Sequence, residues 1–260
     1  MEDKSKVEEV KSGEELVFGD TTDFYMRVFA EGSAKHPAKM NISFLTCLIT
    51  RYTTEGETIL DCFGGTGSTG YIAALLKRRS VLVEIEPVYV KLISDTMRKI
   101  AEMWRRPYIL QGDARTLRKG LKKAGWPTTL SIQTIITSPP YADMLKSVEM
   151  VKGGYSYQDG QLGRMPLPEH LVEVEKVYQE CYAVLGQGQK MILVVRNYIR
   201  KGSVVDYVYE TYKLCEKVGF KLVDVLKMRL PKLRAELTDY YATHPFTDQV
   251  LHEYALVFVK

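Results

Sequence analysis

Short apolar runs alternate with amphipathic stretches from residue 58 onward, and this alternation is the chain's strongest structural signal. The apolar runs of the first half predict four strands, at residues 58–60, 81–85, 108–110 and 132–136. The stretches with helical periodicity between them predict helices at about 68–79, 88–104 and 115–124. Strands that alternate with helices are typical of a parallel sheet covered on both faces.

The alternation resumes after residue 167. It predicts helices at about 169–185 and 204–218, and strands at 191–195, 220–228 and 254–259. The last two strands could form the antiparallel edge that many doubly wound sheets carry. We therefore predict an α/β fold with a doubly wound, mostly parallel, seven-stranded sheet of the Rossmann-like kind.

Two segments depart from this rhythm. Residues 142–167 are rich in Gly, Tyr and Met without a clear period, which predicts an insertion in the form of a long loop or lid. Residues 1–20 are charged and are expected to be partly disordered or loosely docked. We expect one domain over residues 36–260, preceded by an N-terminal extension over residues 1–35.

Composition narrows the class of protein. The chain has 260 residues, 45% of them hydrophobic, which suits one large α/β domain. Its net charge of +4 weakly favours a polyanionic partner, although an ordinary surface rich in Lys and Glu explains it equally well. The four cysteines include no CxxC pair, so no metal site and no disulfide framework are expected. The polar N-terminus and the absence of an apolar run near the roughly 20 residues that span a bilayer predict a cytoplasmic protein.

A glycine-rich turn, DCFGGTGSTG, follows the first of these strands and opens a helix. Glycines let the backbone approach a ligand, and a helix N-terminus offers free N–H groups to it. The turn lacks the lysine of a triphosphate-binding loop. Its candidate ligand-binding residues are Asp61, Phe63, Gly64, Gly65, Thr66, Gly67, Ser68 and Thr69.

Acidic residues follow the next two strands. Glu84 is placed to bind both hydroxyls of a ribose, and we prefer it to Glu86, which lies two residues further on. Asp113 follows the third strand and could accept a hydrogen bond from an adenine amino group. An N-cap of the helix that follows is the competing interpretation of Asp113.

The fourth strand runs into a rigid turn formed by Ser138, Pro139, Pro140 and Tyr141. The exocyclic nitrogen of a base is a poor nucleophile, because its lone pair is delocalised into the ring. Two acceptors that hold the amino hydrogens would direct the lone pair toward an incoming methyl group. We assign these roles to the Ser138 hydroxyl and the Pro139 carbonyl, and we expect Tyr141 to stack on the exposed base.

Together these motifs resemble the N4-cytosine and N6-adenine amino-methyltransferase family. The resemblance implies S-adenosyl-L-methionine as the cofactor. In it, residues 61–67 look like the cofactor loop, Glu84 like the ribose acid and Asp113 like the adenine contact. His36 and Lys39, in the segment HPAKM, look like the element beside the methionine part of the cofactor. Ser138 in first place is similar to the cytosine-N4 branch, since adenine-directed members more often carry Asp or Asn.

The sequence also offers candidates for binding the substrate. Tyr155 and Arg196 are our further candidates for binding it. DNA-modifying members of the family usually carry a sizeable target-recognition region, and residues 142–167 look too short for that role. We therefore expect methylation of cytidine N4 in a structured, ribosomal RNA.

Several alternatives remain. Within the same class of enzyme they are DNA N4-cytosine or N6-adenine methylation and guanine N2 methylation. From other classes they are a non-catalytic, cofactor-binding subunit that docks on nucleic acid, and a nicotinamide oxidoreductase. Methylation at cytosine carbon 5 is disfavoured, because it needs a nucleophilic cysteine, typically after proline, and the chain has no Pro-Cys pair.

Overall fold

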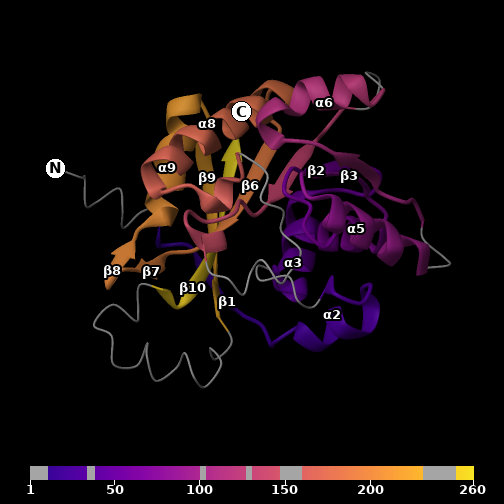
Figure 1. The fold of residues 1–260 in the computed structure, drawn as a ribbon, viewed down its shortest axis with the longest axis horizontal. Helices are drawn as coiled ribbons and strands as arrows, with labels where there is room; N and C mark the ends of the chain where they lie inside the picture. The colour runs from indigo at the N-terminus through magenta and orange to yellow at the C-terminus, as the bar shows by residue number, and fades with distance from the viewer. Residues whose placement is uncertain (1–10, 34–38, 100–103, 127–130, 147–159, 231–249) are drawn as a thin grey trace.

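The fold is taken from a computed structural model (Figure 1), which describes residues 11–33, 39–99, 104–126, 131–146, 160–230 and 250–260. Within these residues a single large sheet runs through the molecule, with helices on both of its faces.

The sheet has eight strands in the order β1-β9-β10-β6-β5-β2-β3-β4. All neighbouring strands are parallel except β10, which pairs antiparallel with both β6 and β9. The strands are β1 (Glu14–Val17), β2 (Thr58–Asp61), β3 (Arg79–Glu84), β4 (Tyr108–Gln111), β5 (Thr134–Thr137), β6 (Lys190–Val195), β9 (Lys221–Arg229) and β10 (His252–Val259). The predicted α/β class, the mainly parallel sheet and the antiparallel edge are confirmed.

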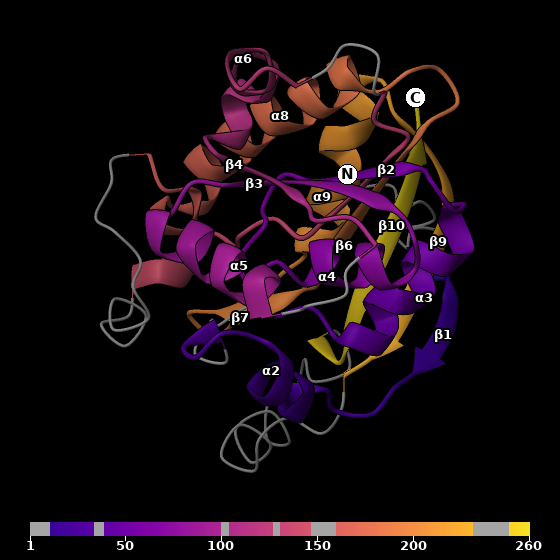
Figure 2. The same cartoon turned by 90° about the vertical axis from the view of Figure 1, so that its right-hand side faces the viewer.

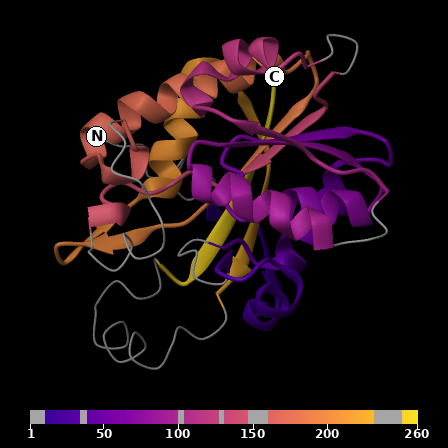
Figure 3. The same cartoon turned by 45° about the vertical axis from the view of Figure 1, so that its right-hand side comes forward.

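Two layers of helix cover the sheet, as Figures 2 and 3 show from two sides. One layer consists of α6 (Leu117–Lys123), α8 (Leu167–Val184) and α9 (Tyr207–Val218), and its apolar residues share a core with the strand residues Val81, Val83 and Leu193. The other consists of α2 (Thr22–Val28), α3 (Ile42–Tyr52), α4 (Ser68–Leu75) and α5 (Pro87–Lys99), packed on Ile59, Ile136 and neighbouring strand residues. None of the helices in the described ranges is both long and apolar enough to cross a bilayer.

The predicted number of seven strands is wrong, because β1 adds an eighth at the edge of the sheet. Its residues lie in the segment that we expected to be disordered or loosely docked. Only one position of this four-residue strand, Leu16, is even partly buried, and it packs into the core on the α3 side. So short a strand with one inward side chain leaves almost no hydrophobic pattern in the sequence.

The sequence also did not predict a small two-stranded sheet, which is separate from the large one. Strands β7 (Tyr198–Arg200) and β8 (Ser203–Val205) form a hairpin directly after β6, where the predicted helix was to begin at residue 204. Lys201 and Gly202 both have positive φ, of 49° and 77°, which is typical of the two-residue turn of a tight hairpin. The following helix begins at Tyr207, because the Asp206 carboxylate accepts a hydrogen bond from the Tyr209 N–H and caps it.

The insertion at residues 142–167 is described at both ends. Its first end forms a 3₁₀ turn at Met144–Lys146 and its second end another at Leu162–Arg164. The side chains of Leu145 and Leu162 are 2% and 7% exposed, so both ends are packed onto the domain. Tyr155 lies outside the described residues.

Candidate active site

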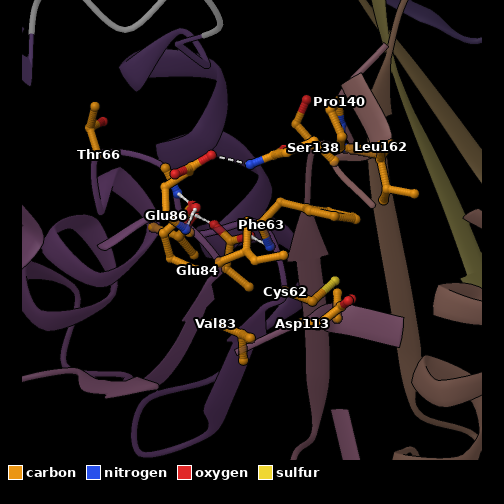
Figure 4. Close-up of a pocket in the computed structure, with 18 of the residues that line it drawn as sticks. Cys62, Phe63, Thr66, Val83, Glu84, Glu86, Asp113, Ser138, Pro140 and Leu162 are labelled. Atoms are coloured by element: carbon orange, nitrogen blue, oxygen red, sulfur yellow. Dashed lines mark hydrogen bonds between the residues drawn. The ribbon is translucent and has the colours of Figure 1, made fainter. Parts of the chain in front are cut away.

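A cavity opens at the carboxyl ends of the parallel strands β2, β3, β4 and β5. Its volume is about 1010 Å³, which includes solvent space at its mouth, and Figure 4 shows the side chains that surround it. Both ends of the insertion close one side of it through Met144, Leu145 and Leu162. Ligands bind at this edge in open α/β sheets.

Most of the predicted site residues line this cavity. They are Lys39, Asp61, Phe63, Gly64, Gly65, Thr66, Ser68, Thr69, Glu84, Asp113, Ser138, Pro139 and Pro140. Thirteen residues from separate motifs therefore line one cavity, because the parallel strands that carry most of them end at the same edge of the sheet.

The glycine-rich turn has a backbone that its sequence explains. Gly65 and Gly67 have φ values of 51° and 86°, in the left-handed region that glycine adopts at least cost. Gly67 is the N-cap of α4 and does not itself line the cavity. The turn is fastened to the next strand, because the Gly64 N–H donates to the Val83 carbonyl at 2.8 Å.

Asp61, at the end of β2, ties the turn to β5. Its carboxylate accepts hydrogen bonds at 2.6 Å from both the Thr69 and the Thr137 hydroxyls, and at 3.1 Å from the Phe63 N–H. Burial raises the pKa of this carboxyl, and the three hydrogen bonds oppose the rise. Asp61 therefore fixes the cofactor-loop candidate against the strand that leads to Ser138.

Glu84 ends β3 and points to the same turn. One of its oxygens accepts from the Gly65 N–H and the other from the Glu86 N–H, each at 2.8 Å. Burial raises the pKa of Glu84 to about 7, partly offset by these two hydrogen bonds. Each carboxylate oxygen has a second lone pair, so Glu84 can still accept two hydrogen bonds from a ligand.

Glu86, the competing acid, also lines the cavity but has a different environment. It is 1% exposed and accepts a hydrogen bond from the Gln161 side-chain amide, which belongs to the second end of the insertion. Its backbone carbonyl accepts from the Tyr89 and Val90 N–H groups at the start of α5. Glu86 therefore connects the insertion to the cavity wall, whereas Glu84 supports the turn.

Asp113 is the N-cap of the turn that follows it, and it also lines the cavity, where its role toward an adenine stays a prediction. It lines the cavity, and as the N-cap of the 3₁₀ turn Ala114–Thr116 it accepts from the Arg115 N–H at 2.8 Å. The Arg115 guanidinium binds the same carboxylate at 2.6 Å and bridges to Glu173 on α8 at 2.8 Å. These two carboxylates raise the pKa of Arg115 further above its usual range.

The SPPY turn follows β5 and presents two acceptors to the cavity. Neither the Ser138 hydroxyl nor the Pro139 carbonyl makes a hydrogen bond to another residue in the described ranges. Figure 4 shows Ser138 and Pro140 in the cavity wall formed by this turn. Two acceptors on a rigid backbone are therefore available at a site that also holds a ribose-binding candidate.

Tyr141 and Arg196 lie beside the cavity and not in its lining. The Tyr141 ring is 9% exposed and packs edge-on against Tyr198 and Tyr207, with centroids 5.4 and 5.3 Å away. The Arg196 guanidinium lies over the same ring, 5.9 Å from its centroid. A base that stacks on Tyr141 would have to take a place that Arg196 now covers.

Some residues were missed or fall outside the described ranges. His36 and Tyr155 lie outside them, and their roles stay predictions. Gln161 and Met40 line the cavity without having been proposed as site residues; Met40 ends the HPAKM segment, whereas no motif in the sequence marks Gln161. Tyr25, on α2, donates a hydrogen bond to the Met40 carbonyl at 2.8 Å and so holds this part of the cavity wall.

The chain also matches known proteins. A family model described as DNA methylase matches residues 4–95. Two curated relatives are type II methyltransferases: M2.DpnII of Streptococcus pneumoniae is 38% identical over 60 residues, and M.BglI of Bacillus subtilis is 39% identical over 57 residues. These matches cover 23% and 22% of this chain, and 22% and 16% of the relatives' own lengths.

A solved structure supports the fold over most of the chain. Precorrin-6y C5,15-methyltransferase from Geobacter metallireducens superposes with a TM-score of 0.52 at 15% identity, over 89% of this chain and 93% of that one. The fold, the family match and the two relatives agree with the motifs around the cavity. The matched segment is therefore similar to the DNA methylase family and to two type II methyltransferases, in agreement with the resemblance that the motifs indicate.

Proposed function

We propose that this protein transfers the methyl group of S-adenosylmethionine to the exocyclic amino nitrogen of a nucleic-acid base, and that the base is cytidine in a folded RNA. The observation that carries the proposal is the placement of Ser138 and Pro139. Their two acceptors, without partners in the described ranges, line the same cavity as Glu84 and the glycine-rich turn.

The cavity fits a nucleoside cofactor with a charged methionine part. Glu84 has spare lone pairs for two ribose hydroxyls, and the N-terminus of α4 supplies backbone N–H groups through Thr66 and Ser68. Asp113 lines the far side, where an adenine amino group would need an acceptor. Lys39 and Met40 also line the cavity, and they would hold the methionine part. When bound, the cofactor supplies an electrophilic methyl group on a sulfonium.

The chain's own residues prepare the acceptor nitrogen. Ser138 Oγ and the Pro139 carbonyl would each accept one amino hydrogen, which turns the nitrogen lone pair out of conjugation with the ring. The nitrogen lone pair would then be directed at the cofactor's methyl carbon, and transfer would leave the carbon–sulfur bonding pair on the neutral thioether product. The nitrogen afterwards loses a proton to solvent. No covalent intermediate with the protein and no metal ion is required.

The structural setting supports an unpaired base in RNA. Among the described elements, the hairpin of β7 and β8 projects beyond the sheet, and the others belong to the sheet, to its two layers of helix or to the ends of the insertion. Methylation of a base already unpaired in a folded RNA avoids the cost of extruding it from a duplex. Ser138 at the first position of the turn supports cytidine N4 as the acceptor, through its similarity to that branch of the family.

DNA is the second candidate substrate. The family model that matches residues 4–95 is described as DNA methylase, and both curated relatives are type II methyltransferases. On this alternative the cavity and the chemistry are unchanged, and the target base must be turned out of a duplex.

The test is transfer of a radiolabelled methyl group to ribosomal particles, to free ribosomal RNA and to duplex DNA in parallel reactions. We expect label in RNA, recovered as N4-methylcytidine after digestion and mass spectrometry. Label in duplex DNA alone would favour the second candidate. Tight binding of the cofactor without transfer to any nucleic acid would contradict the proposed activity.

A further inference from the structure

The hairpin formed by β7 and β8 emerges at the same edge of the sheet as the cavity. We call residues 198–205 the ribbon. It follows β6, whose carboxyl end is Val195, and β6 is parallel to β5, which ends beside the SPPY turn. Figures 1 and 3 show the ribbon projecting beyond the sheet below α9.

Side-chain contacts fix the ribbon to the SPPY turn and to the residues directly after it. Tyr198, its first residue, packs against the Tyr141 ring with centroids 5.4 Å apart. The Arg200 guanidinium donates a hydrogen bond to the backbone carbonyl of Asp143, two residues after Tyr141. A ligand bound on the ribbon would therefore be held at a set position relative to Ser138.

Three cations lie in or next to the ribbon. Arg200 and Lys201 are exposed at its tip, and Arg196 lies over Tyr141 at its base. None of the three forms an ion pair with another residue of the described ranges, whereas Arg115 and Arg118 on the far side of the cavity do.

Among the residues that the structure describes, three acidic groups lie near the ribbon, and none of them forms an ion pair with Arg200 or Lys201. Asp206 is paired with Lys11. Asp143 acts on Tyr198, and Glu253 lies near Arg196 at the ribbon's base. Arg200 and Lys201 are thus exposed and have no carboxylate partner within the described part of the chain.

We propose that the tip of the ribbon, Arg200 and Lys201, binds the phosphates of an unpaired RNA strand next to the target nucleotide. This inference rests on the proposed function. Arginine and lysine neutralise phosphates and release their counterions, so the affinity depends on salt. Contacts to phosphates also fix the position of the strand without recognising its sequence. The ribbon would thereby guide the target base toward the cavity.

The test compares two double variants that each remove two positive charges. Arg200→Gln with Lys201→Asn removes the tip's charges, keeps a donor for the Asp143 carbonyl, and suits the positive φ at position 201. Lys122→Gln with Lys123→Gln is the control on α6, which lies at the opposite end of the molecule in Figure 1. Fluorescence anisotropy with a cytidine-containing single-stranded RNA is measured over a series of salt concentrations.

We expect the tip variant to bind this RNA about tenfold more weakly at low salt, with a log–log salt slope smaller by roughly 1 to 2. The control variant should match the unaltered protein, and calorimetry should give the same cofactor affinity for all three. Equal RNA affinity and slope in the tip and control variants would overturn the inference. So would a loss confined to duplex DNA, or an unaltered protein that binds no RNA.

Failure of the proposed activity is detected separately. If the unaltered protein binds RNA through the ribbon but transfers no methyl group to any nucleic acid, the proposed activity is wrong. The RNA-binding role of the ribbon's tip is then still supported. If the unaltered protein transfers methyl groups and the tip variant retains full RNA affinity, the proposed activity is retained and the RNA-binding role of the ribbon is wrong.

Discussion

At the scale of single residues, Glu84 meets two demands with one carboxyl group. Its two oxygens hold the N–H groups of Gly65 and Glu86, and the same oxygens face the cavity where a ribose would bind. If Glu84 binds the ribose as proposed, it both shapes the loop and contacts the ligand, and few other side chains could replace it.

We expect Glu84→Ala to weaken cofactor binding about tenfold or more, since a hydrogen bond to a charged group contributes roughly 1.5–3 kcal/mol. Isothermal titration calorimetry measures the change. Glu55→Ala is the control, because that carboxylate is exposed and lies 3.8 Å from the Lys77 ammonium. Unchanged cofactor affinity in Glu84→Ala would transfer the ribose role to Glu86 or exclude the site.

Cofactor binding should depend on pH through Glu84. Burial raises the pKa of its carboxyl to about 7, and a ribose bound by the carboxylate favours the ionised form. Binding should therefore release a proton at about pH 6 and almost none at about pH 8.5, and affinity should fall as the pH drops below 7. Calorimetry in two buffers of different ionisation enthalpy measures the released proton. An affinity independent of pH in this range contradicts the assignment.

The raised pKa has a separate consequence for the cofactor-free protein. The contribution of Glu84 to the free energy of unfolding is fully present below the ordinary pKa of 4.5. It is lost as the pH rises through about 7.

Ser138 and Cys62 both line the cavity, yet they should respond differently to truncation. Ser138→Ala removes one of the two acceptors for the amino hydrogens, and we expect kcat to fall by about 10². Cys62→Ala removes a buried thiol that contacts the Thr137 hydroxyl at 3.7 Å, and substantial activity should remain because direct transfer needs no thiol.

Steady-state kinetics and cofactor titrations on both variants separate these effects. The cofactor affinity of Ser138→Ala should stay close to that of the unaltered protein. A folded but inactive Cys62→Ala would contradict the direct-transfer mechanism.

The residues that line the cavity could be predicted from the sequence where a motif follows a strand. Asp61, Glu84, Asp113 and Ser138 each lie at or within three residues of the end of an apolar run, and parallel strands bring their carboxyl ends to one edge. Gln161 reaches the cavity from the irregular insertion, where no periodic pattern fixes the direction of a side chain. Its contact with Glu86 therefore could not be inferred.

At the scale of elements, α3 shows how a local signal supports the cavity. Asn41 is its N-cap and accepts from the Ser43 and Phe44 N–H groups at 3.0 and 3.1 Å, while its amide donates to the Gly19 carbonyl. Met40, the residue before this cap, lines the cavity. The cap thus fixes the point at which the chain turns from the cavity wall into the helix.

Asn41→Ala should lower the free energy of unfolding by about 1–2 kcal/mol, because two helix N–H groups lose their acceptor. Ser43→Ala on the same helix is the control, and its effect should be within about 0.5 kcal/mol. Chemical denaturation followed by circular dichroism gives both values. Equal stability of the two variants would show that the cap contributes nothing measurable.

The elements predicted best are those with long periodic patterns. The helix expected at 169–185 is found at Leu167–Val184, and the strand expected at 220–228 is found at Lys221–Arg229. The hairpin of β7 and β8 was missed because each strand has three residues, too few for a period-two pattern to be distinguished from a helix start.

At the scale of the whole molecule, the sheet has one edge formed by a segment distant in sequence. Strand β1 pairs with β9, so residues near the N-terminus are joined to the antiparallel strands near the C-terminus. The same antiparallel pair supports β6, from which the ribbon begins. The edge that carries β1 is therefore continuous, through hydrogen-bonded strands, with the part of the sheet beside the cavity.

This edge depends on a close approach that only glycine allows. A Cβ atom at Gly13 would lie 2.1 Å from the Val225 carbonyl oxygen, closer than any real contact. Gly13→Ala should therefore displace β1 and expose the β9 residues Leu226 and Met228, which pair with Glu14 and Leu16. Hydrogen exchange followed by mass spectrometry should show faster exchange in residues 14–17 and 226–229. Gly19→Ala is the matched control, because a Cβ there meets no atom within 4 Å and exchange should not change. Unchanged protection of these residues in Gly13→Ala would show that the edge adapts to the added methyl group without releasing β1.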